Sequence, residues 1–240
     1  PLIIIISAAF FASTGSFVDS IIPALSITLM VLTGVFSTLA VSFVLSKTLL
    51  KGIPSTFTLE LPPYRAPQVG RIIYSSIIDR TIFVLSRAVA VAAPAGAITW
   101  LLANIYVGDM SILIHMANFL DPLGKIIGLD GFILIAFIAG FPANEIVIPV
   151  MLMAYMSTGT LTDFESIESL RQILISNGWT AITAINVMLF SLLHWPCSTT
   201  LWTIKKETGS LKWTFAAFLI PTAVTFVVCF ITANIFRLIW

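Results

Sequence analysis

Long apolar runs, separated by shorter polar segments, make up most of the chain. A helix needs about 20 mostly apolar residues to cross a bilayer. Two apolar runs contain helix breakers: 110–127 is interrupted at Pro122-Leu123-Gly124, and 132–156 at Gly140 and Pro142. The pattern therefore predicts an all-α polytopic membrane protein, a helical bundle in which some helices are broken. The predicted crossings are residues 21–46, 82–106, 180–204 and 215–238, with a truncated crossing at 1–12.

Two segments have the apolar stripe of an amphipathic helix. Residues 160–177 carry apolar side chains at helical spacing with charges between them, and Thr162 or Asp163 is placed to cap the helix. Residues 68–80 carry a similar stripe beside basic residues, as expected for a helix lying on the cytoplasmic interface of a membrane. We therefore expect interfacial amphipathic helices beside the crossings.

Composition supports the membrane assignment. Of the 240 residues, 58% are hydrophobic and 10% are charged, whereas soluble domains carry about 25% charged residues. A soluble core could not bury this much apolar surface. The chain contains no metalloprotease, hydrolase or nucleotide-binding motif and nothing that suggests nucleic-acid binding. We therefore expect a transporter rather than an enzyme.

The distribution of basic residues predicts the topology. Nine of the twelve Lys and Arg residues fall in two groups, which the positive-inside rule places in the cytoplasm. An even number of crossings must separate the groups, so 132–156 is expected to be a re-entrant hairpin turning at Gly140–Glu145, with arms of roughly 15 Å. In the alternative, 132–156 crosses the membrane and 110–127 is the extra crossing. The groups are Lys47, Lys51, Arg65, Arg71, Arg80 and Arg87, and then Lys205, Lys206 and Lys212.

Glu145 lies inside a long apolar run, directly after the break at Gly140 and Pro142. An acidic side chain at the centre of a membrane helix costs about 2.5–3.5 kcal/mol on insertion scales and usually marks a pathway or binding site. Broken backbone survives at that depth only where protein buries it or where it lines a wet cavity. We therefore expect a transport site at Glu145. The alternatives are that Glu145 takes up a proton or pairs with a basic residue elsewhere.

A second break is predicted at Pro196, which lacks an N–H and frees a carbonyl near Leu192. The side chains around the two breaks offer nitrogen, oxygen and sulfur, a mixture that suits Fe(II), Mn(II) or Zn(II) better than Mg(II) or Ca(II). The competing structural roles are a small hydrophobe for Cys197 and a carbonyl donor for His194. The candidate metal ligands are Glu145, Asn144, Cys197, His194 and Ser198.

Three segments resemble motifs of the bacterial ferrous iron transport protein B family. Residues 57–67 contain Glu60-Leu61-Pro62-Pro63-Tyr64-Arg65-Ala66-Pro67, which resembles the family's Glu-Leu-Pro-Pro-Tyr-Arg-x-Pro motif. Residues 140–147 resemble its Gly-x-x-Ala-Lys-Glu-x-Val segment, with Asn144 where lysine is common. Residues 195–201 and 206–213 resemble its Pro-Cys and Glu-Thr-Gly-Ser-x-Lys-Trp motifs. The resemblance extends over nearly the whole chain.

The resemblance implies a partial, gate-type membrane permease domain over 1–240, with a second gate repeat at about 81–240. The chain starts without Met in mid-run, so we expect a fragment that lacks the family's G domain and first gate repeat. The resemblance further implies Fe(II) as the transported substrate, GTP and Mg in the G domain only, and a multi-pass location in the bacterial inner membrane. Implied partners are the missing domains, small cytoplasmic accessory proteins and further copies of the chain. Implied structural or coupling residues are Glu60, Pro62, Pro63, Gly140, Pro142 and Pro196.

Two other functions compete with Fe(II) transport. Related gate-type proteins share the repeat architecture, so the chain could belong to a permease for an organic solute such as a nucleoside. It could also be a membrane scaffold or assembly subunit that transports nothing. Thermal stabilisation by Fe(II) or by nucleosides separates the first two. A scaffold predicts that neutralising Glu145 changes stability alone.

Overall fold

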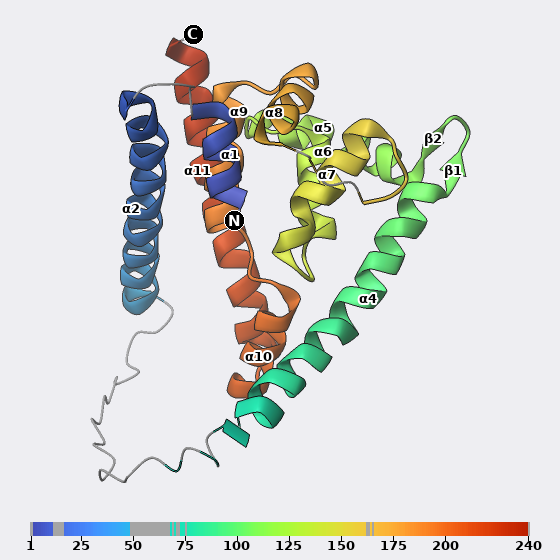
Figure 1. The fold of residues 1–240 in the computed structure, drawn as a ribbon. Coiled ribbons are helices and arrows are strands. Elements are labelled where there is room, and N and C mark those ends of the chain that lie inside the picture. Colours follow the sequence, from blue (N-terminus) through green and yellow to red (C-terminus); the bar gives the residue numbers. More distant parts are fainter. Residues whose placement is uncertain are drawn as a thin grey trace.

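A computed structural model describes residues 2–11, 17–48, 68, 70, 73–74, 76–161, 164 and 166–239, and the described chain is almost entirely helical (Figure 1). The segment with Glu60, Pro62 and Pro63 lies outside the described residues. The expected all-α polytopic fold with broken helices is confirmed.

Four predicted crossings are confirmed by helices that are long and apolar enough to span a membrane. The third of these crossings consists of two helices separated by a short break at Pro196, as predicted. The spanning helices are α2 (Phe17–Lys47), α4 (Phe83–Asn104), α9 (Ala181–Leu193) with α10 (Ser198–Thr208), and α11 (Leu211–Ile239).

The other elements are short. A two-stranded antiparallel hairpin, which the sequence pattern did not predict, pairs Tyr106 with Ser111 beyond the end of α4. Residues Ser76–Ile82, labelled η1, form a π-helical stretch before α4 where an amphipathic α-helix was expected. The remaining elements are α1 (Leu2–Phe11), β1 (Tyr106–Val107), β2 (Met110–Ser111), α5 (Ile112–Ile126), α6 (Gly131–Ala139), the 3₁₀ turn η2 (Asn144–Ile146), α7 (Val147–Met156) and α8 (Ile167–Ser176).

The predicted interruption at Pro122-Leu123-Gly124 is wrong, because α5 continues through Pro122 to Ile126. The chain bends by 111° after α5 instead. Gly128 takes a left-handed conformation there, with a φ of 73°, and Asp130 caps α6 by accepting a hydrogen bond from the N–H of Ile133 at 2.7 Å. The glycine that ends α5 and the aspartate that caps α6, two residues apart, therefore decide where the helix ends, and the proline inside α5 does not.

The predicted start of the amphipathic helix at residue 160 is also wrong, since α8 begins only at Ile167. Ser166 forms a reciprocal cap with Ser169: each hydroxyl accepts a hydrogen bond from the other residue's N–H, at 3.1 and 3.2 Å. The expected capping residues, Thr162 and Asp163, lie outside the described residues.

Helices α6 and α7 form the predicted hairpin. Each is 9 or 10 residues long, which corresponds to roughly 15 Å and is too short to cross a bilayer alone. In Figure 1, α6 runs toward the middle of the molecule and α7 returns toward the end where α6 began. Both helices are largely buried, and α6 contacts α9 through Phe137 and Phe190, whose ring centroids are 4.7 Å apart.

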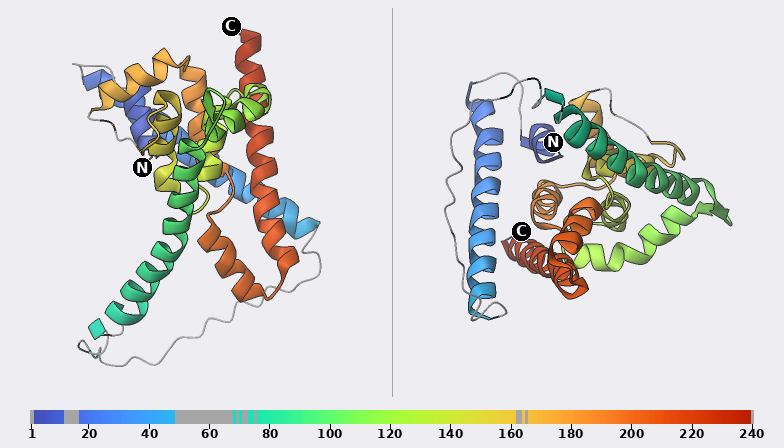
Figure 2. Two further views of the ribbon diagram at one scale, coloured as in Figure 1. Left: turned by 90° about the vertical axis from the view of Figure 1, so that its right-hand side faces the viewer. Right: turned by 90° about the horizontal axis from the view of Figure 1, so that it is seen from below.

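The long helices surround this buried centre. Helices α2 and α4 run along two sides of the molecule (Figure 2) and expose large apolar side chains such as Phe36 and Trp100, as lipid-facing helices do. The Lys47 end of α2, the start of α4 and the α10–α11 turn, which carries Lys206 and Lys212, lie toward the same end of the molecule (Figure 1). We call this the basic end.

Candidate substrate site at two broken helices

The break between α9 and α10 is a stretch of extended backbone. His194 has φ −62° and ψ 176°, and Cys197 has φ −62° and ψ 159°. Pro196 has no N–H to continue the helical pattern, so the carbonyl of Leu192 loses its partner one turn earlier. Helix α10 then starts afresh at Ser198 with Cys197 at its N-cap. A new helix N-terminus therefore stands in the middle of a membrane crossing, and its first turn closes with a hydrogen bond from the N–H of Thr200 to the carbonyl of Cys197 at 3.0 Å.

The break between α6 and α7 is a tight turn. Gly140 ends α6, and a Cβ there would lie 2.5 Å from Cγ2 of Val147 and 3.0 Å from the carbonyl oxygen of Ala136. A side chain at position 140 would therefore force the two arms apart. Pro142 lies in the turn, and a single 3₁₀ turn at Asn144–Ile146 leads into α7.

A backbone hydrogen bond joins the two breaks. The N–H of Ser198, the first residue of α10, donates to the carbonyl of Phe141 at 3.0 Å. The contact is supported by the ring of Phe137, whose centroid lies 5.2 Å from that of His194. The two broken segments that were predicted separately thus meet at one place in the fold.

The predicted metal ligands are distributed unevenly around this junction. Asn144 and Glu145 are exposed on the hairpin tip, whereas His194, Cys197 and Ser198 are half-buried. The Sγ of Cys197 lies 3.1 Å from the hydroxyl oxygens of Thr199 and Thr200. Within the described part of the chain, no group of three or more His, Cys, Asp or Glu side chains is close enough to hold a metal ion. The junction therefore supplies separate donors rather than a complete cage.

Three buried side-chain atoms at the junction have no hydrogen-bond partner among the described residues: His194 Nε2, Trp195 Nε1 and Ser198 Oγ. Each buried, unpaired polar group costs about 1–3 kcal/mol. Trp195 was not among the predicted site residues. No pattern in the sequence marks its indole N–H as unpaired, because that depends on which groups the fold brings beside it. These unpaired atoms make the junction a candidate binding site.

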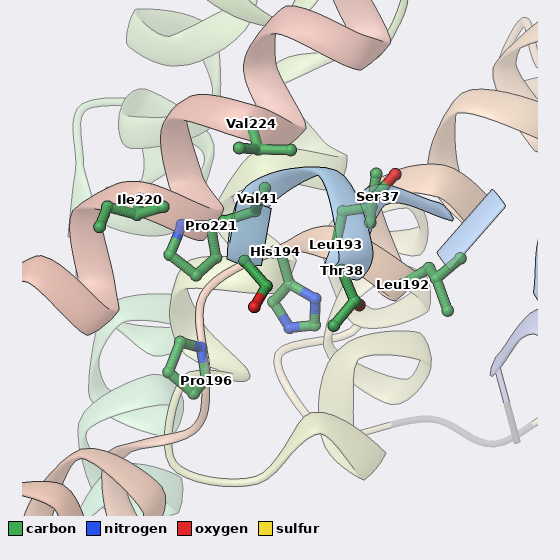
Figure 3. A pocket seen from close by; sticks show the side chains of 11 residues that line it. Ser37, Thr38, Val41, Leu192, Leu193, His194, Pro196, Ile220, Pro221 and Val224 are labelled. Atoms are coloured by element: carbon green, nitrogen blue, oxygen red, sulfur yellow. The ribbon is translucent and has the colours of Figure 1, made fainter. Parts of the chain in front are cut away.

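The extended backbone directs these side chains into two cavities. Successive residues of an extended chain point to opposite sides. His194 and Pro196 line a cavity of about 450 Å³ between α2, the α9–α10 break and α11 (Figure 3), and Trp195 lines an apolar cavity of about 410 Å³ between α5, α6 and α11. The lining residues of the first cavity are Ser37, Thr38, Val41, Ser42, Leu192, Leu193, His194, Pro196, Ile220, Pro221 and Val224.

Comparison with known proteins finds two matching family models and several ferrous iron transporters. The family model described as "Nucleoside recognition" matches residues 85–211, and the model described as "Ferrous iron transport protein B C terminus" matches residues 27–79. The Fe(2+) transporter FeoB of Staphylococcus aureus strain MSSA476 is 30% identical over 209 residues, which cover 82% of this chain and 29% of that protein. The Fe(2+) transporter FeoB of Leptospira interrogans strain Fiocruz L1-130 is 26% identical over 263 residues, covering 99% of this chain and 37% of that protein. The chain thus spans about a third of the length of these relatives. No solved structure matches it.

Proposed function

Because the chain belongs to the ferrous iron transport protein B family, we propose that the joined breaks of α6–α7 and α9–α10 form part of a route for Fe(II) across the bacterial inner membrane. The observation that carries the proposal is the cluster of polar atoms at residues 194–198 that have no partner among the described residues, next to the hydrogen bond between Ser198 and Phe141. Unpaired polar groups at membrane depth are costly, and they are expected where a polar substrate passes.

The donors at the junction suit Fe(II), which accepts nitrogen, oxygen and sulfur ligands. His194 Nε2, the Cys197 thiolate and the Ser198 hydroxyl would replace part of the ion's water shell at the break. Asn144 and Glu145, exposed on the hairpin tip, would receive or release the ion at the rim of this site. A transported ion must leave as readily as it enters, so an incomplete ligand set is an advantage.

Broken helices also provide a means of alternating access, since half-helices can tilt about their breaks. The hydrogen bond from Ser198 to Phe141 would make the tips of α6–α7 and α10 move together. We further propose that GTP and Mg act in a G domain of the whole protein, with a first gate repeat completing the route. In this proposal the gate repeat at about 81–240 carries the site, and Glu60, Pro62 and Pro63 couple it to the G domain. Accessory proteins and further copies of the chain are proposed partners.

Radioactive Fe(II) uptake tests the proposal in a bacterial strain without its own ferrous transporters. The full-length protein that contains this chain would carry Cys197→Ser or Glu145→Ala, and Cys229→Ser is the matched control. Cys229 is buried in α11, where its Sγ lies 3.7 Å from the carbonyl oxygen of Asn186. Losing one ligand of a weak site should lower uptake about tenfold, equivalent to about 1.4 kcal/mol. The control should stay within about twofold of the unmodified protein.

Uptake by Cys197→Ser and Glu145→Ala that equals the uptake by Cys229→Ser, at equal amounts in the membrane, would remove the site assignment. If the full-length protein takes up no Fe(II) above the vector background, the proposed substrate is wrong.

A nucleoside is the second candidate substrate, because the family model matching residues 85–211 is described as "Nucleoside recognition". Thermal unfolding of the purified full-length protein separates the two substrates, since a ligand that binds only the folded state raises the unfolding temperature. A higher unfolding temperature in the presence of Fe(II) under anaerobic conditions supports Fe(II) as the substrate. A rise with nucleosides and none with Fe(II) supports the second candidate.

A further inference from the structure

We infer that the 450 Å³ cavity between α2, the α9–α10 break and α11 is a second station for a partly hydrated divalent metal ion, held by His194 and by hydroxyl groups of α2 (Figure 3). The inference rests on the proposed function and extends it, because it places part of the route on the α2 side of the break. Ser42 lies one turn before the Lys47 end of α2, so the cavity lies toward the basic end.

His194 is held in the form that binds a metal. Its Nδ1 lies 2.9 Å from the carbonyl oxygen of Ser191. A carbonyl only accepts hydrogen bonds, so Nδ1 carries the hydrogen and Nε2 keeps a free lone pair. Metal-binding histidines are commonly fixed in this way by a carbonyl behind the ring. Nε2 has no partner within the described chain and is itself buried, so the ring would have to turn before its lone pair met an ion in the cavity.

Helix α2 supplies hydroxyl oxygens to the same cavity. The hydroxyl of Thr38 donates to the carbonyl of Gly34 at 2.8 Å, which leaves the oxygen lone pairs free to face a cation. Ser37 and Ser42 also line the cavity, and Thr38 and His194 both point into it in Figure 3. The residues of α2 approach closely because Gly34 has no side chain: a Cβ there would lie 3.1 Å from Cδ2 of Leu192.

The chemistry of the walls favours a metal ion over an organic solute. Of the eleven lining residues, one carries an imidazole and three carry hydroxyl groups; the other seven are apolar, and none of the eleven is an amide, a phenylalanine, a tyrosine or a tryptophan. A nucleobase is normally recognised by stacking and by paired hydrogen bonds, which these walls do not offer. One imidazole nitrogen and several hydroxyl oxygens can instead replace some of the waters around an ion. A cavity of about 450 Å³ leaves room for the remaining waters, each of which takes about 30 Å³ in the liquid.

Thr38→Val in the full-length protein tests the station, with Thr33→Val as a matched control. Both threonines lie on α2 and donate to the carbonyl four residues earlier at 2.8 Å, so both changes remove the same intrahelical bond. Of these two threonines, Thr38 lines the cavity. We expect Thr38→Val to lower Fe(II) uptake about tenfold, while Thr33→Val stays within about twofold of the unmodified protein.

A labelling experiment reports on occupancy independently of transport. Ser42→Cys would be alkylated with N-ethylmaleimide in membranes under anaerobic conditions, and mass spectrometry of the peptide would give the rate. We expect Fe(II) to slow the labelling severalfold, and we expect this protection to disappear when Ser42→Cys is combined with His194→Ala.

The station is overturned if Thr38→Val and Thr33→Val transport alike and Fe(II) leaves the labelling rate unchanged. If Cys197→Ser still lowers uptake in that case, the proposed function survives and the station alone is wrong. If Cys197→Ser and Glu145→Ala also transport normally, the proposed function itself is wrong.

Discussion

The base of the α6–α7 hairpin, where α6 starts and α7 ends, differs from its tip in whether the buried polar side chains form hydrogen bonds. At the base, the Tyr155 hydroxyl donates to Asp130, and the indole N–H of Trp179 donates to the Tyr155 oxygen at 2.8 Å. The network ties the start of α6 to the end of α7 and to Trp179, which lies two residues before the start of α9. At the tip, where the hairpin meets the α9–α10 break, His194, Trp195 and Ser198 each leave a buried polar atom without a hydrogen-bond partner among the described residues.

This difference separates structural polarity from functional polarity. A buried polar network whose members are all bonded holds elements in place, whereas an unpaired group lowers stability by about 1–3 kcal/mol and needs another reason to be there. We therefore interpret the base as the fixed anchor of the hairpin and the tip as the part that meets the substrate. Substitutions at the base and at the tip should therefore differ in their effects on stability and on transport.

Tyr155→Phe should have the largest effect on stability. The change leaves the Trp179 indole and one Asp130 oxygen without their partner, and each orphaned group costs about 1–3 kcal/mol. We expect the unfolding temperature of the full-length protein in detergent to fall by several degrees. Tyr106→Phe is the control, because the Tyr106 side chain is exposed. Equal unfolding temperatures for the two variants would show that the base network does not anchor the hairpin.

Ser198→Pro should have an intermediate effect, because it removes the hydrogen bond that joins the two breaks. Proline is tolerated at the first position of a helix, and Cys197 before it is already extended, with ψ 159°. The main losses are therefore the N–H that donates to Phe141 and the Ser198 hydroxyl. Leaving the Phe141 carbonyl unpaired should cost about 1–3 kcal/mol. Fe(II) uptake should fall further than in Ser198→Ala, which keeps the N–H; equal uptake by the two variants would exclude mechanical coupling through this bond.

The sequence predicted the helix breaks near Gly140 and Pro196 correctly, but it predicted a break at Pro122 that does not occur. Pro196 breaks a crossing as expected, whereas Pro122 lies inside the continuous helix α5. One proline removes one hydrogen bond, and the surrounding structure decides whether the helix continues. The true end of α5 was marked by Gly128 and Asp130, a C-terminal glycine followed by an N-cap, and this signal could have been recognised in the sequence.

The candidate site was harder to predict than the fold. Glu145 was predicted as a site residue because it is a charge inside an apolar run, and the structure places it exposed at the hairpin tip. The unpaired atoms at 194–198 and the α2 hydroxyls at Thr38 depend on contacts between segments far apart in the chain. The hydropathy of a segment indicates whether its residues are buried in the membrane, but it does not indicate which buried polar groups form hydrogen bonds.

Ser198→Ala should have the smallest effect on stability, and its sign distinguishes the tip from the base. The Ser198 hydroxyl is buried and has no partner in the part of the chain that the structure describes, so replacing it with hydrogen removes an unsatisfied group and opens little space. We expect the unfolding temperature to stay the same or to rise, by the equivalent of at most about 1 kcal/mol. Fe(II) uptake should nevertheless fall, because the junction loses one oxygen donor. Functional sites often lower stability in this way, so that removing them stabilises the fold. A clear fall in unfolding temperature with unchanged uptake would instead make Ser198 a structural residue, and the difference between tip and base would disappear.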